Sequence, residues 1–209
     1  EMCIRDRFDE GHQLPAKCLN QFALRFHSGG TLQGLLDSER WLAASAETWV
    51  AQGLDERLIP AMTSLVGDLI QRSEDIAEQL WQLLPETDFE RAEHRFPHGR
   101  VPADLAEQAA GLVAQWDQLY REAARLEAAL ENSQTAGSSS ADSAIAGAAD
   151  PDLNLANAQG LAARAEQQLA VWRAFANAPG EGEPGDGWAR WCQHRGTPQS
   201  LECQASPIL

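Results

Sequence analysis

The chain has 209 residues, 44% of them hydrophobic and seven of them tryptophan, so it holds enough apolar material to bury a core. Acidic residues number 31 against 16 basic ones, giving a formal charge of -15. Most of the surface should therefore repel a phosphate backbone, which leaves any nucleic-acid contact local. No apolar run approaches the ~20 residues that cross a bilayer, so we expect a soluble protein with no membrane partner.

The cysteines and histidines do not form a metal motif. Cysteines stand at positions 3, 18, 192 and 203, and no two have the C-x-x-C spacing of zinc or redox sites. Cys192 and Cys203 lie in β-compatible segments and can face each other, but without a signal peptide we expect them to be reduced. His94 and His98 lie in a proline-flanked segment, where we do not expect a shared helix face or a metal.

Both ends of the sequence are predicted to be cut. Residues 1–7 show no cap, periodicity or alternation, although they precede a motif that should follow a buried strand. They are similar to translated adapter read-through, so we expect them to be non-native and exclude them from the fold. At the other end, residues 206–209 stop inside an extended apolar segment.

The first predicted elements are a short strand and a helix. Apolar residues alternate over 22–26, which predicts a strand at 23–27. Thr31 follows two glycines and is expected to cap the first helix. Apolar residues recur at helical spacing from there to Gln52-Gly53, where the helix should end.

A second and a third helix follow, separated by a basic connection. Asp55 is expected to cap the second helix, whose apolar stripe begins at Leu58 and which ends before Pro85. Residues 85–102 predict an exposed connection, and residues 103–131 predict the third helix. The connection is the one locally basic stretch, and its candidate nucleic-acid contacts are Arg91, Arg95 and Arg100. A merely solvated loop is the alternative.

The last predicted elements are a loop, a helix and a hairpin. Residues 133–152 are small and polar, so burial cannot offset their ordering entropy and we expect a flexible loop. A fourth helix is expected at 153–178, before a run rich in proline and glycine. Segments 188–194 and 201–207 are β-compatible and predict a hairpin. The fold class is therefore mainly α, with four long helices inserted between short β segments that return to one sheet.

The seven tryptophans have two interpretations. Aromatic side chains can form platforms on which the bases of a single strand stack. Trp41, Trp116 and Trp172 fall on apolar stripes, so we expect them in the core instead. Trp49 and Trp81 remain open between the two roles.

Asp9-Glu10-Gly11-His12 is the one run with a chemical interpretation. In motor ATPases an aspartate at a strand end helps to hold Mg²⁺ against the phosphates, and a neighbouring glutamate orients the attacking water. Adjacent carboxylates leave a strand end in opposite directions, so the two can share these tasks. The alternative is an acidic surface turn, because a D-E-x-H match arises by chance in roughly a few per cent of such chains.

Residues 8–15, Phe-Asp-Glu-Gly-His-Gln-Leu-Pro, resemble motif II of DinG-type, XPD-related DNA helicases, particularly the YoaA-like branch. In that family the box continues into Gln-Leu-Pro and a helical arch follows. The arch returns through an aromatic Arg-Trp strand and a Pro-Leu segment, which here look like Arg190-Trp191 and residues 207–209. The resemblance covers 8–209 in order, although only its first eight residues are motif-grade.

The resemblance implies an internal fragment of an ATP-dependent 5′→3′ DNA helicase. Residues 8–30 would end the first RecA-like α/β motor domain, 31–187 would form the arch, and 188–209 would return to the motor domain. The implied catalytic residues are Asp9, Glu10 and His12. Asp9 would hold Mg²⁺ through water, Asp9 and Glu10 would face ATP, and His12 would couple the nucleotide state to neighbouring motifs.

The resemblance also implies partners and a setting for the full-length parent. These are single-stranded or forked DNA, a role in DNA repair, a monomeric state and the bacterial cytoplasm. A 4Fe–4S cluster is implied for the parent, but its ligands are not in this chain, which also lacks a G-x-x-x-x-G-K-[ST] phosphate loop. We therefore expect the fragment itself to be inactive. The competing hypothesis is a non-enzymatic helical scaffold or interaction module.

Overall fold

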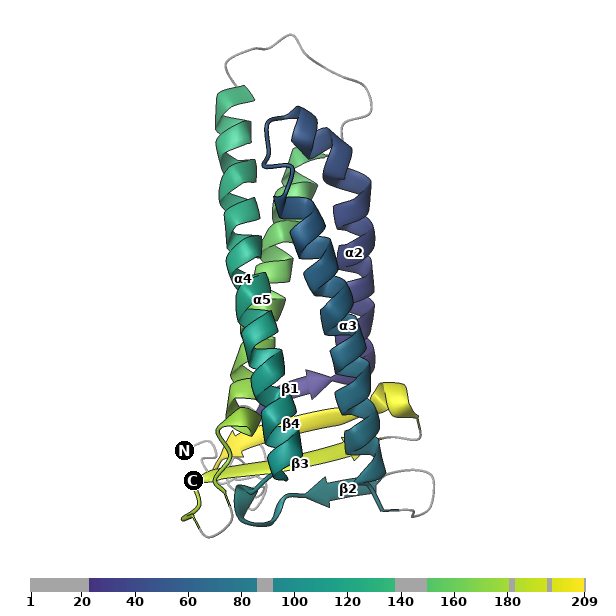
Figure 1. Ribbon diagram of the computed structural model, residues 1–209, viewed down its shortest axis with the longest axis vertical. Helices are drawn as coiled ribbons and strands as arrows, with labels where there is room; N and C mark the ends of the chain where they lie inside the picture. The colour runs from purple at the N-terminus through teal and green to yellow at the C-terminus, as the bar shows by residue number, and fades with distance from the viewer. Residues whose placement is uncertain (1–22, 86–91, 138–149, 181–182, 195–196, 209) are drawn as a thin grey trace, which may run out of the picture.

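The computed structural model describes residues 23–85, 92–137, 150–180, 183–194 and 197–208. Within them, four long helices rise from one side of a four-stranded antiparallel sheet (Figure 1). The expected mainly helical fold is confirmed. None of the described helices is long and apolar enough to span a membrane.

Helix α2, Ser28–Ala51, begins three residues before the expected cap at Thr31. The reason is His27, whose Nδ1 accepts a hydrogen bond from the amide of Gly30 at 3.1 Å and so caps the helix. Gly29 lies inside the first turn, where a Cβ atom would come within 2.7 Å of the Gln199 carbonyl oxygen. The glycine is therefore needed for close packing and does not mark a helix boundary, so the predicted start was wrong.

Helix α3, Leu58–Gln82, follows a tight turn close to the expected position. Gly53 has a φ of 90°, in the left-handed region that favours glycine, and it ends the first helical segment as predicted. Asp55 Oδ1 accepts a hydrogen bond from the Arg57 amide, so Asp55 caps the turn that leads into the helix. Leu65, Leu69 and Ile76 are among the side chains that α3 buries in the core.

Helix α4, Ala103–Gly137, continues six residues beyond the predicted end at 131, and α5, Pro151–Ala176, begins two residues before the predicted start. Asp150 caps α5 by accepting a hydrogen bond from the amide of Asp152, and Pro151 occupies its first turn. The expected flexible loop at 133–152 is therefore wrong at both of its ends. Its middle, 138–149, lies outside the described residues.

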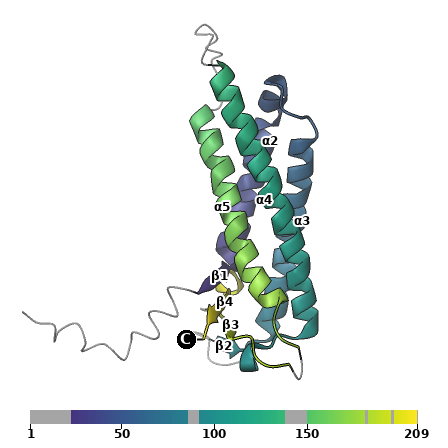
Figure 2. The ribbon, with the colours of Figure 1, turned by 90° about the vertical axis from the view of Figure 1, so that its left-hand side faces the viewer.

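Helix α5 is tied to both of its neighbours by polar contacts, and the four helices form one bundle (Figure 2). On the α2 side, Arg164 Nη1 donates to the Gly34 carbonyl at 2.8 Å. Trp41 Nε1 donates to Asn154 Oδ1 at 3.0 Å. On the α4 side the contacts are Gln159 with Glu127 and Arg173 with Asp117.

The bundle core is rich in aromatic side chains. Trp116 and Trp172 are fully buried, as expected, and Trp49 is 1% exposed. Trp41 and Trp81 are only partly buried but pack against the same core. Phe26 of the sheet packs against Trp172 with ring centroids 4.9 Å apart, so the core is continuous from the helices into the sheet.

The sheet has the order β1-β4-β3-β2, and its bounds are Leu24–His27, Glu202–Pro207, Trp188–His194 and Ala92–Arg95. The predicted strand at 23–27 and the predicted hairpin are confirmed. Strand β1 pairs with β4, so the chain enters and leaves the helical part side by side. Two helical hairpins therefore stand on one sheet, one formed by α2 and α3 and the other by α4 and α5.

Strand β2 was not predicted. Its sequence Ala-Glu-His-Arg lies in the stretch that the sequence analysis takes as an exposed connection, and only Ala92 is buried. Pairing with β3 supplies what the local sequence lacks, because the four residues lie in antiparallel register with a longer and more apolar strand. A 3₁₀ turn, η3, follows at Pro97–Gly99.

Candidate functional site

The predicted catalytic residues Asp9, Glu10 and His12 lie outside the described residues, as does Arg91. Two predicted nucleic-acid contacts are described, Arg95 on β2 and Arg100 after η3. The site is therefore built from the sheet and from the loops that connect it to the helices.

The two faces of the sheet differ in what they contact. On β3, Arg190 donates to the Ala174 carbonyl of α5, and His194 stacks on Trp81 of α3. Alternate residues of a strand point to opposite faces, so Trp191 and Gln193 lie on the face turned away from the helices. We call this the outer face of the sheet.

Arg95 lies at one end of a row that crosses the outer face. The row consists of cross-strand partners, one on each strand in the order β1, β4, β3 and β2: Arg25, Gln204, Trp191 and Arg95. The Arg95 side chain is 84% exposed and forms an ion pair with Glu93, two residues away on the same face. Trp191 is half-buried in the middle of the row. Arg95 is the direct neighbour of Trp191 in this row, whereas Arg25 is separated from Trp191 by Gln204, which is 4% exposed. An aromatic ring beside an exposed arginine is an arrangement that can stack on a base and contact a phosphate.

Arg100 is directed elsewhere. Its Nη2 donates to the Glu183 carbonyl at 2.6 Å, in the loop between α5 and β3, and its Nε is buried without a hydrogen-bond partner. The two arginines therefore contact different parts of the molecule and do not form the single basic cluster that their spacing predicts. Arg95 is the better placed of the two for an external phosphate.

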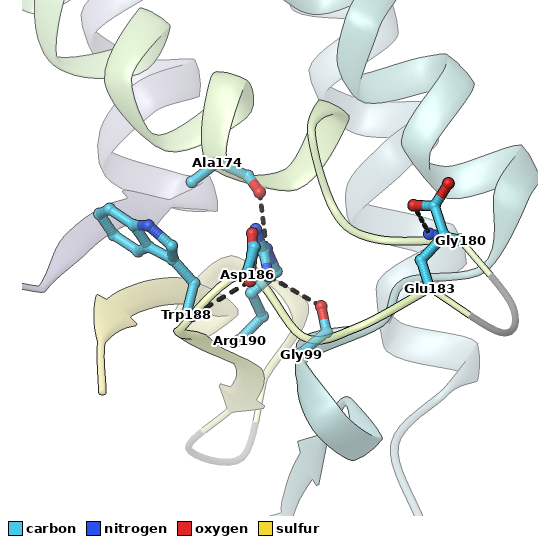
Figure 3. Close-up of polar contacts among 7 residues, drawn as sticks. All are labelled: Gly99, Ala174, Gly180, Glu183, Asp186, Trp188 and Arg190. Atoms are coloured by element: carbon cyan, nitrogen blue, oxygen red, sulfur yellow. Dashed lines mark hydrogen bonds and ion pairs between the residues drawn. The ribbon is translucent and has the colours of Figure 1, made fainter. Parts of the chain in front are cut away.

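The same loop is held by Arg190, for which the sequence predicts only a place in an Arg-Trp strand. Its side chain is 1% exposed. Nε donates to the Ala174 carbonyl at 2.6 Å and Nη1 to the Gly99 carbonyl at 2.9 Å, while both terminal nitrogens reach the Asp186 carboxylate (Figure 3). One guanidinium thus joins the end of α5, the turn η3 and strand β3.

The ionised carboxylate of Asp186 is favoured by its hydrogen bonds. The hydrogen bond from Arg190 holds the pKa of the Asp186 carboxyl below its usual value, against the opposing effect of burial. The amide of Trp188 also donates to Asp186 Oδ1 at 3.1 Å, which closes a turn immediately before β3. Glu183 closes a second turn, because its Oε2 accepts from the Gly180 amide (Figure 3).

The contacts of Arg190 with Ala174, Gly99 and Asp186 form what we call the junction. Gly99 permits η3 to approach β3 closely in this junction. Its φ is 71°, and a Cβ atom there would lie 2.2 Å from the Trp188 carbonyl oxygen and 2.9 Å from Arg190 Nη1. No side chain fits without moving the backbone of β3. The Pro-His-Gly sequence is the signal that could have indicated a tight turn here, although not its partner.

The polar groups around Arg190 bond to one another and to backbone groups. Among the residues that the structure describes, no group of three His, Cys, Asp or Glu side chains could hold a metal ion. Arg190 and Asp186 are both satisfied by each other and by backbone groups, so the pair fixes the base of the helical hairpins. Comparison of the chain with protein-family models and with curated proteins finds no match.

Proposed function

We propose that this chain is part of an ATP-dependent 5′→3′ DNA helicase of the DinG type, comprising its Asp-Glu-Gly-His box and its helical arch. The observation that carries the proposal is the run of residues 8–15, followed along the chain by a helical unit that begins at Ser28. The box alone is short enough to arise by chance. Its position before two long helical hairpins is what favours the helicase.

The topology supports an insertion. Leu24 of β1 is the register partner of Ala205 of β4, so the stems of the whole helical unit are neighbours. A unit with adjacent stems can be accommodated in a larger domain without displacing that domain's other strands. The four described strands are antiparallel throughout. That residues 8–30 and 188–209 belong to a RecA-like motor domain remains part of the proposal, and the parallel strands of that domain would come from other parts of the parent protein.

In the proposed mechanism, the box residues act on bound ATP. Two adjacent carboxylates are hard oxygen donors of the type that Mg²⁺ takes, so the donor set fits this ion, which supplies charge neutralisation at the phosphates when bound. Asp9 would hold it through water. Glu10 orients the attacking water and His12 couples nucleotide state to neighbouring segments. The phosphate-binding loop must come from another part of the parent protein.

The two cysteines that the structure describes do not fit an iron–sulfur cluster. Such a cluster takes four thiolates, whereas Cys192 and Cys203 are buried as protonated thiols opposite each other in the sheet. No step is assigned to a cluster in this chain. If the parent carries one, its ligands lie elsewhere in that protein.

The proposed DNA contact in this chain is the row across the outer face of the sheet. Trp191 provides the stacking surface and Arg95 the exposed cation, which agrees with single-stranded DNA as the partner. Because the formal charge is -15, this contact is expected to be local and sensitive to salt. The competing function is a helical scaffold, in which the same face would bind a protein.

The test compares ATP turnover in the longer protein that contains this sequence with turnover in the chain alone. We expect DNA-stimulated turnover only in the longer protein, because carboxylates without a phosphate-binding loop have no positioned nucleotide. Glu10→Gln in the longer protein should abolish turnover and leave ATP binding, measured with a fluorescent analogue, largely intact. Glu56→Gln, in the turn between α2 and α3, is the matched control and should change neither.

Three results would contradict the proposal. Turnover by the chain alone would show that it is not a dependent part of a larger motor. An unchanged rate in Glu10→Gln would remove the box from the mechanism. A longer protein that binds no ATP would favour the scaffold.

A further inference from the structure

The backbone hydrogen bonds fix how Cys192 and Cys203 face each other. In an antiparallel pair, opposite residues alternate between hydrogen-bonded and non-hydrogen-bonded positions. The Ile208 amide donates to the Gly187 carbonyl, which makes Gly187 and Ile208 a hydrogen-bonded pair of β3 and β4. Cys192 and Cys203 lie five register positions from that pair, and because the two kinds of pair alternate, theirs is a non-hydrogen-bonded pair.

The two outer strands give the same result independently. The Phe96 amide donates to the Arg190 carbonyl, so two residues further along β3 the backbone of Cys192 is directed to β2. The Ser28 amide donates to the Leu201 carbonyl, so the backbone of Cys203 is directed to β1. The backbone N–H and C=O groups of the two cysteines therefore do not hydrogen-bond to each other, as a non-hydrogen-bonded pair requires.

This position brings the thiols close together. Opposite residues in non-hydrogen-bonded pairs have Cα atoms about 4.5 Å apart, with the side chains nearer than in the alternate pairs. Disulfides usually join Cα atoms roughly 4.4 to 6.8 Å apart, so the cysteines lie at the short end of the bonding range. Both side chains are on the helix-facing side of the sheet, and Cys192 Sγ lies 4.0 Å from the Leu80 carbonyl oxygen.

The surroundings keep both thiols protonated while the sheet is closed. Both are fully buried. Burial raises the pKa of Cys192 to about 12 and that of Cys203 well above its usual value, with Glu93 and Glu202 adding to the effect. Because both thiols are buried and protonated, reaction requires the sheet to open transiently from the helices.

We propose that Cys192 and Cys203 are a reversible disulfide site that clamps β3 to β4. With a low-molecular-weight disulfide such as oxidised glutathione, one protein thiolate attacks a glutathione sulfur and releases one reduced glutathione. The second protein thiolate then attacks the mixed disulfide, forms the Cys192–Cys203 bond and releases the other. Two protein thiols are oxidised and one glutathione disulfide is reduced to two thiols, so atoms and electrons balance.

The clamp acts on the central pair of strands, which carries Arg190, Trp191 and Gln204. A bond across β3 and β4 prevents their separation, and so preserves both the junction beneath the helices and the row on the outer face. Because the Cα spacing is at the short end of the range, we expect the disulfide to be readily reduced again.

The test uses the full chain with Cys3→Ser and Cys18→Ser, so that only the two sheet cysteines remain. After incubation with oxidised glutathione in low urea, intact mass should show the loss of two hydrogens and no retained glutathione. Peptide mapping should link 192 to 203. The equilibrium constant for forming the internal disulfide should be larger in the folded chain than in denaturing urea. The reason is thermodynamic linkage: if the disulfide stabilises the folded state, folding must favour formation of the disulfide by the same free energy.

The matched control moves one thiol along the same strand and face. Cys203→Ser with Ala205→Cys places the second thiol at a diagonal position, about 7–8 Å away, where glutathione adducts should persist without an internal bond. Cys203→Ser alone should retain one adduct on Cys192. The proposal is overturned if adducts persist on both native cysteines, if the diagonal variant closes equally well, or if folded and denatured chains give the same equilibrium constant.

Discussion

Arg190 and Asp186 form an ion pair in which the guanidinium is 1% exposed and the carboxylate 29% exposed. The two residues are four positions apart, one on strand β3 and the other in the loop before it. The pair connects that loop to α5 and η3 through the Ala174 and Gly99 carbonyls. Stability is therefore expected to depend more on this pair than on the other ion pairs described.

Removing the buried cation should be costly. Arg190→Met removes the guanidinium that donates to two carbonyls and to the Asp186 carboxylate, and we expect a loss of about 3–5 kcal/mol in the free energy of unfolding. Urea unfolding followed by circular dichroism measures the change. The control is Arg95→Met, which breaks a pair whose arginine is 84% exposed and should cost less than about 1 kcal/mol. Equal costs would contradict the role of the junction.

The same pair makes stability depend on pH in acid. The folded-state pKa of Asp186 is lowered from 3.8, so its contribution is fully present above that value and is lost as pH falls through the lower folded-state pKa. Asp186→Asn should be less stable than the natural chain near neutral pH, and the difference should shrink below about pH 3.8. Unfolding curves of both proteins across this range measure it. A difference independent of pH would mean that ionisation is irrelevant.

Gly99→Ala should destabilise the chain more than Gly53→Ala. Both glycines have positive φ, at 71° and 90°, so alanine is strained at each by about 1–2 kcal/mol. At Gly53 a Cβ atom meets nothing within 4 Å, whereas at Gly99 it meets the Trp188 carbonyl at 2.2 Å. The additional loss of stability in Gly99→Ala therefore reports the clash of the new Cβ atom with the Trp188 carbonyl. Thermal unfolding of the two variants side by side would show whether it exists.

The outer face of the sheet is expected to bind single-stranded DNA in the longer protein. Trp191→Leu should weaken binding by about 1–3 kcal/mol through lost stacking. Arg95→Gln should weaken binding less and reduce the dependence of affinity on salt by about one phosphate contact. Fluorescence anisotropy at several salt concentrations separates the two effects. Arg121→Gln, on the exposed side of α4, is the control, and a loss as large as that of Arg95→Gln would argue against this face.

Helical periodicity located the four helices because each buries a stripe of large apolar residues, such as Leu35 and Trp49 in α2. Their boundaries were less accurate wherever a partner decides them. His27 caps α2 with a side-chain nitrogen, which residue preferences for caps do not anticipate. The expected loop from residue 133 failed for a similar reason, because α4 continues as helix to Gly137 despite its polar sequence.

The sites were harder to anticipate than the helices. Strand β2 has no apolar alternation, and pairing with β3 alone defines it. Arg190 was noted for a resemblance and not for its three polar partners, because two of them are backbone carbonyl acceptors, one in η3 and one in α5. No local pattern encodes contacts between carbonyls and a side chain 91 positions away. The facing of Cys192 and Cys203, in contrast, follows from hairpin register and was predictable.

The order of strands in the sheet has a consequence for synthesis of the chain. Both outer strands, β1 and β2, are made before residue 100, but their partners β3 and β4 occupy the last part of the sequence, 188–207. During translation, each helical hairpin can form from contacts near in sequence while the two outer strands still present unpaired edges. We expect a nascent chain stopped before residue 188 to be helical but prone to self-association. Emergence of residues 188–207 would then complete the sheet and remove the exposed edges together.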